Sequence, residues 1–284
     1  MPGPSAAVLT RLAAEAGADL RFAGLPGGEF RMGSEDALAY PADGEGPVRT
    51  VRVAAFAMAT TTVTVAQFAA FVADTGHRTD AEVLGTSLVF AGVLPAGVRA
   101  ASRTVVGTPW WSEVVGATWF QPEGPGSSAV GRSAHPVTHV SLRDARAYAE
   151  WVGARLPTEV EWEYAARGGL AQQPYPWGAQ REPDGRARMN TFPGRFPDGP
   201  TGPVGTMPAD AFAPNGFGLH NTTGNVWEWT QSTFAAHDTR PVLRGGSYMC
   251  HASYCRRYRT SARTAVTADS SLGHTGFRLA VTTG

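Results

Sequence analysis

The two cysteines of the 284-residue chain, Cys250 and Cys255, lie five positions apart and are its residues best suited to chemistry. Thiols this close in sequence can form a disulfide, bind a soft metal or exchange electrons. Without further cysteines a four-thiolate zinc site is excluded, whereas two thiolates suffice for Cu(I). Arg256 and Arg257 follow directly, and nearby positive charge lowers the pKa of a thiol. From these residues alone, Cu(I) binding, a disulfide and a pair of inert buried thiols all remain open.

The composition of the chain argues against several classes of protein. Charged residues make up 17% of the chain and the formal net charge is zero, which argues against bulk electrostatic binding to nucleic acid or an anionic membrane. All 24 basic residues are arginine, which we attribute first to coding bias and second to a preference for bidentate carboxylate pairing. No apolar run could span a membrane and no signal-peptide pattern is present, so we expect a cytoplasmic protein. We also expect it to be a monomer. In that compartment a close cysteine pair is more often metal-binding or catalytic than structural.

The elements that position the pair must be short. The chain contains 34 Gly, 21 Pro and eight Trp, which predicts a loop-rich fold held together by buried aromatic side chains. Ser5 predicts a helix over residues 6–16, within an N-terminal helical extension of residues 1–24. No repeat of fixed period and no linker-like shift in composition occurs, so residues 25–284 are expected to form a single domain.

Local patterns predict the regular elements of this domain. The alternation over residues 51–58 predicts one strand, and Thr64 predicts the start of a helix that ends near Gly76. We expect residues 84–134 and 172–221 to be largely irregular, because turn-forming residues recur throughout both stretches.

Two capping-box patterns predict the clearest helices. Ser141 with Asp144 marks the start of one helix, and Thr158 with Glu161 marks the start of the next.

Six separated stretches, in this order along the chain, resemble the sulfatase-modifying-factor superfamily. They cover residues 25–34, 135–141, 155–169, 215–219, 221–229 and 276–278. The resemblance implies an α+β fold of the formylglycine-generating-enzyme type, a C-type-lectin-like variant that is loop-rich with little regular secondary structure. Because the superfamily includes both enzymes and binding modules, the fold alone does not imply a function.

The cysteine segment resembles the active site of the formylglycine-generating enzymes. It reads Gly-Gly-Ser-Tyr-Met-Cys-His-Ala-Ser-Tyr-Cys over residues 245–255. The resemblance implies that Cys250 and Cys255 hold Cu(I), to which a substrate thiolate and O2 are added. It further implies an oxidoreductase of sulfatase maturation, which converts the cysteine of a sulfatase-type Cys-x-Pro-x-Arg segment to Cα-formylglycine. A hydrogen leaves the substrate Cβ, and the thioaldehyde is hydrolysed to the aldehyde.

The same resemblance implies further site residues. Ser247 and Tyr254 match catalytic positions, where hydroxyls can hydrogen-bond the oxygen species or the substrate backbone. The positions that match substrate-binding residues are Trp227, Tyr248, Arg263 and His274. The alternatives are packing in the core for the aromatic residues and a carboxylate pair for Arg263.

Two stretches resemble calcium sites of the family. The first consists of Asn221, Gly224, Val226 and Glu228. Two side chains and two carbonyls supply only oxygen, which suits Ca2+; the alternative is an Asn-Gly turn with a capping Glu. Asn190 and Thr191 match the first half of a second site, but Asp198 is the only carboxylate nearby and does not match the acid expected there.

Four departures from the family pattern bear on the substrate. Val266 and His274 stand where asparagine is usual, Leu279 replaces a cysteine, and the stretch between Trp229 and Val242 is short. Replacing asparagine by valine removes hydrogen-bonding capacity. Two alternatives therefore stay open: a copper oxidase of this type acting on a different thiol, either another peptide or a small molecule, and a non-catalytic lectin-like binding module with a vestigial cysteine pair. The intact motif at residues 245–255 argues against the second.

Overall fold

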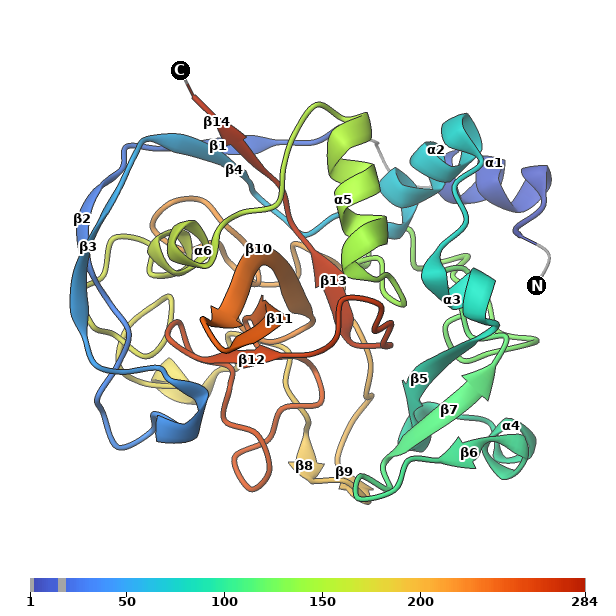
Figure 1. Ribbon diagram of the computed structural model, residues 1–284. Helices are drawn as coiled ribbons and strands as arrows, with labels where there is room; N and C mark the ends of the chain where they lie inside the picture. Colours follow the sequence, from blue (N-terminus) through green and yellow to red (C-terminus); the bar gives the residue numbers. More distant parts are fainter. Residues whose placement is uncertain (1–2, 15–18, 284) are drawn as a thin grey trace.

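A four-stranded sheet lies at the centre of the computed structural model, which describes residues 3–14 and 19–283 (Figure 1). Its strand order is β12-β11-β10-β13. The strands are β10 (Trp227–Ala235), β11 (Asp238–Arg244), β12 (Arg263–Ala265) and β13 (Thr275–Phe277). β10 and β11 form an antiparallel hairpin, whereas β13 runs parallel to β10. The cysteine segment follows β11 directly, so this sheet sets its position.

A second sheet and a separate hairpin hold the N-terminal part of the domain. The sheet contains β1 (Phe22–Leu25), β4 (Phe56–Ala59) and β14 (Ala280–Thr282), and the hairpin contains β2 (Gly28–Met32) and β3 (Arg49–Val53). The expectation of one strand over residues 51–58 is wrong, because β3 pairs with β2 while β4 pairs with β1 and β14. The chain changes sheets between the two strands, where Gly27 packs so closely that a Cβ on it would lie 2.6 Å from the Val53 carbonyl oxygen.

The longer helices begin where the capping patterns predict. They are α1 (Ala6–Ala14), α2 (Val65–Thr75), α5 (Leu142–Trp151) and α6 (Glu159–Ala166). Thr64, Ser141 and Thr158 each accept a hydrogen bond from the backbone N–H three residues on, and the side chain of that residue accepts in return. All three capping predictions are confirmed, and α2 ends at Gly76 as expected. The helix expected over residues 6–16 is present as α1, with residues 15–18 outside the described ranges.

Regular structure occupies much of the stretch expected to be irregular between residues 84 and 134. It comprises β5 (Thr86–Phe90), the 3-10 helix η2 (Ala91–Val93), α4 (Ala96–Ala101), β6 (Arg103–Thr104) and β7 (Trp111–Val115), preceded by α3 (Asp80–Leu84). β7 pairs with both β5 and β6, so this expectation is wrong. The β5–β7 pairing spans a long connection with its own helix, and no local hairpin signal marks such a pair.

Between residues 172 and 221 regular structure is minimal, as expected. The structure describes two two-residue strands there, β8 (Gly194–Arg195) and β9 (Gly199–Pro200), and the 3-10 helix η3 (Pro183–Gly185). One more 3-10 helix, η1 (Pro41–Asp43), lies near the N-terminus. Mixed helices and strands joined by long irregular connections confirm the loop-rich α+β prediction.

Buried aromatic side chains form the main core, as the composition predicts. Phe68 of α2 packs against Trp119 and Tyr148, with ring centroids 5.3 and 5.9 Å apart. Tyr148 of α5 in turn contacts Phe277 of β13 at 5.5 Å. Leu12 of α1 is fully buried in the same cluster, so the N-terminal helix packs against the domain. No helix within residues 3–14 and 19–283 is long and apolar enough to cross a membrane.

Candidate active site

Two consecutive turns bring the cysteine thiols together. Cys250 donates its backbone N–H to the Ser247 carbonyl at 2.9 Å, and Cys255 donates its own to the His251 carbonyl at 2.7 Å. The Sγ atoms of the cysteines are consequently 3.0 Å apart, and both residues are free thiols and buried. A five-residue spacing thus produces direct contact, because the chain between the two thiols folds back on itself.

The two thiols differ in electrostatic character. Burial raises the pKa of Cys250 well above its usual range. The hydrogen bond from the Cys250 thiol lowers the pKa of Cys255 to about 7; burial opposes this shift, and the Arg257 guanidinium adds to it. Cys250 also accepts a hydrogen bond from the Ser247 backbone N–H at 3.4 Å. Two soft sulfur atoms in contact, one of them readily ionised, form a donor set that fits Cu(I).

The thiols line a cavity of about 200 Å³ that gathers most of the expected site residues. Its walls include Ser247, Tyr254, Trp227 and His274, together with Val266, the residue that departs from the family pattern. Trp227, in β10, is 5% exposed and donates its backbone N–H to the His274 carbonyl at 2.8 Å. Burial lowers the pKa of His274 to about 3, so its ring is neutral at ordinary pH, and it meets Trp111 edge to face at 4.7 Å. The cavity is therefore mainly apolar around its two thiols.

Tyr254 lines the cavity and forms, together with the rings of Phe196 and Trp110, a cluster of three aromatic rings that we call the aromatic rim. Tyr254 is 40% exposed and stacks on Phe196, with centroids 4.4 Å apart and planes 2° apart. Trp110 meets Tyr254 edge to face at 4.7 Å and Phe196 at 5.4 Å. The sequence indicated Tyr254 but not Phe196 or Trp110 as site residues, since these rings lie far apart along the chain and no local pattern links them.

Two residues expected to bind substrate lie outside this cavity. The Tyr248 hydroxyl donates to the Gly273 carbonyl at 3.2 Å, and its side chain lines a separate cavity of about 910 Å³. Arg263 donates to the Glu159 carboxylate at 2.6 and 2.9 Å and to the Phe234 carbonyl at 2.8 Å. The structure thus places Arg263 in the carboxylate pair that was its alternative.

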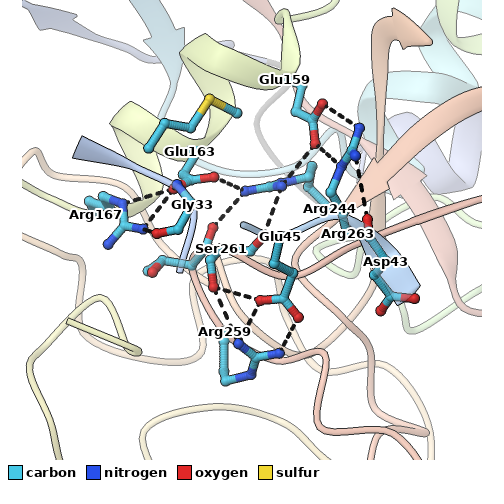
Figure 2. A network of polar contacts seen from close by, with 12 residues as sticks. Gly33, Asp43, Glu45, Glu159, Glu163, Arg167, Arg244, Arg259, Ser261 and Arg263 are labelled. Atoms are coloured by element: carbon cyan, nitrogen blue, oxygen red, sulfur yellow. Dashed lines mark hydrogen bonds and ion pairs between the residues drawn. The ribbon is translucent and has the colours of Figure 1, made fainter. Parts of the chain in front are cut away.

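A buried framework of arginines and glutamates joins α6 to the segment that follows the cysteines (Figure 2). Arg244 of β11 is fully buried and donates to Glu163 at 2.6 Å and to Glu159 at 2.9 Å. Arg259 is also fully buried and donates to both carboxylate oxygens of Glu45, at 2.7 and 2.5 Å. The Arg244 pairs fix the end of β11, just before the cysteine segment, to α6. The Arg259 pair fixes the chain after Cys255 to the N-terminal part of the domain.

Arg257 is a cavity residue whose anchor the sequence does not reveal. Its Nη1 atom lies 4.0 Å from Cys255 Sγ. Its Nε and Nη2 atoms donate to Asp43 at 2.5 and 2.9 Å, across 214 positions of sequence. The sequence indicated that Arg257 lies near the thiols, but a contact across so many positions has no local signal.

The first calcium stretch has an oxygen that lacks a partner. Asn221 Oδ1 is buried and has no hydrogen-bond partner among the described residues, and a cavity of about 30 Å³ lies beside Asn221 and Thr223. One water molecule needs roughly 10–15 Å³ of such space. Glu228 accepts hydrogen bonds from Arg278 and Trp162 on its two oxygens, which leaves part of its lone-pair capacity unused. Of the two side chains expected to bind Ca2+, Asn221 offers an oxygen without a hydrogen-bond partner among the described residues, whereas both oxygens of Glu228 already accept hydrogen bonds.

The second calcium stretch packs against the first. Gly224 has φ 74°, and a Cβ there would lie 2.5 Å from the Asn190 carbonyl oxygen. The Asn190 side-chain amide donates to the Gly205 carbonyl at 2.8 Å and to Asn225 Oδ1 at 3.0 Å. Thr191 accepts a hydrogen bond from Arg181 at 3.0 Å. Protein groups therefore engage the side chains of Asn190 and Thr191.

The chain is similar to known proteins over most of its length. Residues 18–283 match the family described as the sulfatase-modifying factor enzyme 1-like domain. The formylglycine-generating enzyme of Thermomonospora curvata is 52% identical over 277 residues, which cover 90% of this chain and 91% of that protein. That of Streptomyces coelicolor is 50% identical over 297 residues, covering 98% and 95%.

Similarity at a slightly lower level extends to a relative named as inactive. The inactive C-alpha-formylglycine-generating enzyme 2 of Bos taurus is 45% identical over 264 residues, covering 90% of this chain and 86% of that protein. The solved structure of PvdO from Pseudomonas aeruginosa has a TM-score of 0.66 and covers 95% of this chain and 97% of that one. At 23% identity, PvdO shows a shared fold alone. Activity must therefore be argued from the residues of the site.

Proposed function

The chain belongs to the family of sulfatase-modifying factor enzyme 1-like domains, and from this membership we propose that it is a copper-dependent oxidase that uses O2. Its substrate is the cysteine of a Cys-x-Pro-x-Arg segment in a sulfatase, and its product is Cα-formylglycine. Relatives named formylglycine-generating enzymes at 52% and 50% identity support this substrate class. The observation that carries the proposal is the contact of the buried residues Cys250 and Cys255, with sulfur atoms 3.0 Å apart on the wall of a cavity.

The residues of the cavity have separate tasks in this reaction. Cys250 and Cys255 would hold Cu(I), which supplies the redox chemistry with O2 and attracts the substrate thiolate. Trp227 and the other apolar walls exclude water, and the Ser247 and Tyr254 hydroxyls offer hydrogen bonds to the substrate. The aromatic rim offers flat apolar faces to the proline of the substrate segment.

The reaction balances as an oxidation of one carbon–sulfur unit. Two electrons and two protons leave the Cβ–SH group of the substrate, and O2 accepts them. Water then adds to the thioaldehyde, a carbon–oxygen bond replaces the carbon–sulfur bond, and the sulfur leaves as hydrogen sulfide. Reduction of O2 as far as water requires two further electrons from an external thiol reductant.

Calcium has a structural role in the proposal. The unpartnered Asn221 Oδ1, buried beside a small cavity, supports one Ca2+ close to the first residues of β10. Bound there, the ion would fasten the loop that leads into the strand bearing Trp227. It would take no part in the redox steps.

A peptide assay tests the function directly. The copper-loaded protein is incubated with O2, a thiol reductant and a Cys-x-Pro-x-Arg peptide, and mass spectrometry follows the replacement of the peptide sulfur by an aldehyde oxygen. Cys250→Ser and Cys255→Ser should abolish conversion, whereas Ser253→Ala, an exposed change in the same segment, should leave it intact. Absence of conversion by protein that binds Cu(I) one to one would refute the peptide substrate.

A second candidate substrate rests on the cavity wall. Val266 lines the cavity with an apolar side chain where the family usually has asparagine. A smaller or less polar thiol would fit such a wall without leaving polar groups unpaired. The Cu(I)-binding protein that fails with the peptide would then be tested with low-molecular-weight thiols. Failure to bind Cu(I) at all would leave the non-catalytic binding module as the function.

A further inference from the structure

Residues 40–45, which are distant in sequence, contact the segment that follows Cys255. Tyr40 places its ring under three guanidinium groups, those of Arg256, Arg257 and Arg259, at 5.5, 4.5 and 5.7 Å from the ring centroid. The Tyr40 hydroxyl also accepts a hydrogen bond from the Arg256 backbone N–H at 3.0 Å. Together with Asp43 and Glu45, this residue makes the 40–45 loop a clamp on residues 255–261.

Within this clamp, Arg257 is oriented by both of its neighbours. Asp43 engages Nε and Nη2, which fixes one edge of the planar guanidinium, and Tyr40 stacks on its face. The remaining atom, Nη1, is thereby directed at Cys255 Sγ, 4.0 Å away. A guanidinium held at its edge and its face loses little further freedom when it meets a negative charge.

A positive charge beside Cys255 would stabilise thiolates in the cavity. Each thiolate brought into a buried site is costly unless an opposite charge is close. In the proposed reaction Cys250 and Cys255 would hold Cu(I) as thiolates and the substrate would add a third thiolate, so the negative charges in the cavity would outnumber the positive charge of the metal ion. Among the described residues that line the cavity, Arg257 is the one with a permanent positive charge, because burial keeps His274 neutral.

We propose that Arg257 is the counter-cation of the thiolate cluster, and that Asp43 and Tyr40 are positioning residues that hold it beside Cys255. The cluster of three thiolates exists only if the proposed function is correct. The position of the Arg257 guanidinium beside Cys255 does not depend on that function. Arg256 offers the matched comparison: it is the next residue in sequence, bears the same charge and stacks on the same ring, but does not line the cavity.

Thiol alkylation at fixed pH measures this charge without turnover. The full-length protein, reduced and freed of metal with a chelator, is treated with iodoacetate or with iodoacetamide, and peptide mapping quantifies the label on Cys255. Both reagents attack the same thiolate, so the ratio of the two rate constants cancels the fraction of thiol that is ionised. The ratio reports the electrostatic potential that the anionic reagent meets at the sulfur.

The expected pattern separates a counter-cation from a structural clamp. Arg257→Gln should lower the iodoacetate-to-iodoacetamide ratio about fivefold, the effect of one charge at about 4 Å in a water-like medium. Arg256→Gln should leave the ratio near that of the wild type. Asp43→Ala removes a negative charge, so a purely electrostatic role of Asp43 would raise the ratio; a positioning role lowers it, because Arg257 is released from the sulfur.

Several outcomes would overturn the inference. They are an unchanged ratio in folded Arg257→Gln protein, an equal fall in Arg256→Gln protein, and a raised ratio in Asp43→Ala protein. If Arg257→Gln protein does not fold, Arg257→Lys and Arg256→Lys repeat the comparison with the charge kept and the fork to Asp43 lost; only the first should lower the ratio. Failure of the peptide assay together with the expected ratios would refute the peptide substrate, and the placement of the Arg257 charge beside Cys255 by Asp43 and Tyr40 would stand.

Discussion

Glu228 and Arg278 face one another inside the molecule, joined by two hydrogen bonds of 2.7 and 2.8 Å, with neither side chain more than 1% exposed. Trp162 of α6 donates to the same carboxylate at 2.6 Å. The pair connects β10, which bears Trp227, with the residue that follows β13. It therefore couples the core of the central sheet to a wall of the cavity.

Removing one member of this pair should be severely destabilising. Arg278→Met leaves the Glu228 carboxylate buried without its cation, and we expect the free energy of unfolding in urea to fall by about 3–5 kcal/mol. The exposed pair of Arg240 and Asp238 is the control, for which Arg240→Met should cost less than about 1 kcal/mol. The double change Glu228→Gln with Arg278→Met should recover part of the loss. Equal effects of the buried and the surface change would contradict this assignment.

Calcium removal should destabilise the protein through Asn221. A chelator should lower the thermal midpoint of the wild type. Asn221→Ala should abolish the response to added Ca2+ and lower the midpoint further than the chelator does, because the Asn221 amide also donates to the Pro208 and Ala209 carbonyls. Asn190→Ala should retain the response, because the Asn190 side chain is engaged by Gly205 and Asn225. Calorimetric titration should give one Ca2+ per chain. A stoichiometry of two Ca2+ per chain would indicate that the stretch with Asn190 and Thr191 also binds calcium.

The aromatic rim should govern peptide affinity rather than the chemical step. Trp110→Ala should raise KM for a Cys-x-Pro-x-Arg peptide about fivefold to thirtyfold, which corresponds to roughly 1–2 kcal/mol of stacking and burial, with kcat little changed. Replacing the peptide proline by alanine should cost the wild type a similar factor and the variant much less. Trp151→Ala, on the surface of α5, is the matched control. A rim variant that lowers kcat with unchanged KM would place these rings in the chemistry.

Stability should decline in acid through a buried histidine. Burial lowers the pKa of His139 to about 3 in the folded state, below the value of about 6.5 expected for an unfolded chain. Between pH 6.5 and 3 only the unfolded chain binds a proton at this histidine. The contribution of neutral His139 to the free energy of unfolding is therefore complete above pH 6.5, and it falls by about 1.4 kcal/mol for each pH unit below that value. His139→Asn, which tolerates the observed φ of 60°, should reduce the slope by one proton between pH 6 and 4. His237→Asn, at an exposed position, should not change it.

The parts of the fold that the sequence predicted are those in which short-range chemistry decides the outcome. The helix starts at Thr64, Ser141 and Thr158 depend on a partner three residues away, so their patterns are visible locally. The contact between Cys250 and Cys255 likewise arises within a six-residue segment. Each of these features needs no knowledge of the rest of the chain.

The features that the sequence did not predict depend on distant partners. Residues 51–58 form parts of two strands because their partners belong to different sheets, and the strands after residue 84 pair across a long connection. The anchor of Arg257 is Asp43, 214 positions away. The sequence shows that such residues can form hydrogen bonds. It does not show which distant residue is the partner, because only the folded chain brings the two together.

The positively charged residues of the buried framework in Figure 2 are arginines, and the chain has arginine and no lysine at all 24 of its Lys or Arg positions. Lysine amines condense with aldehydes to form Schiff bases, whereas the guanidinium group stays protonated and is a poor nucleophile. The proposed product is an aldehyde released beside the surface of the protein that made it. A chain without a single ε-amine can release that carbonyl without becoming cross-linked to it through a lysine.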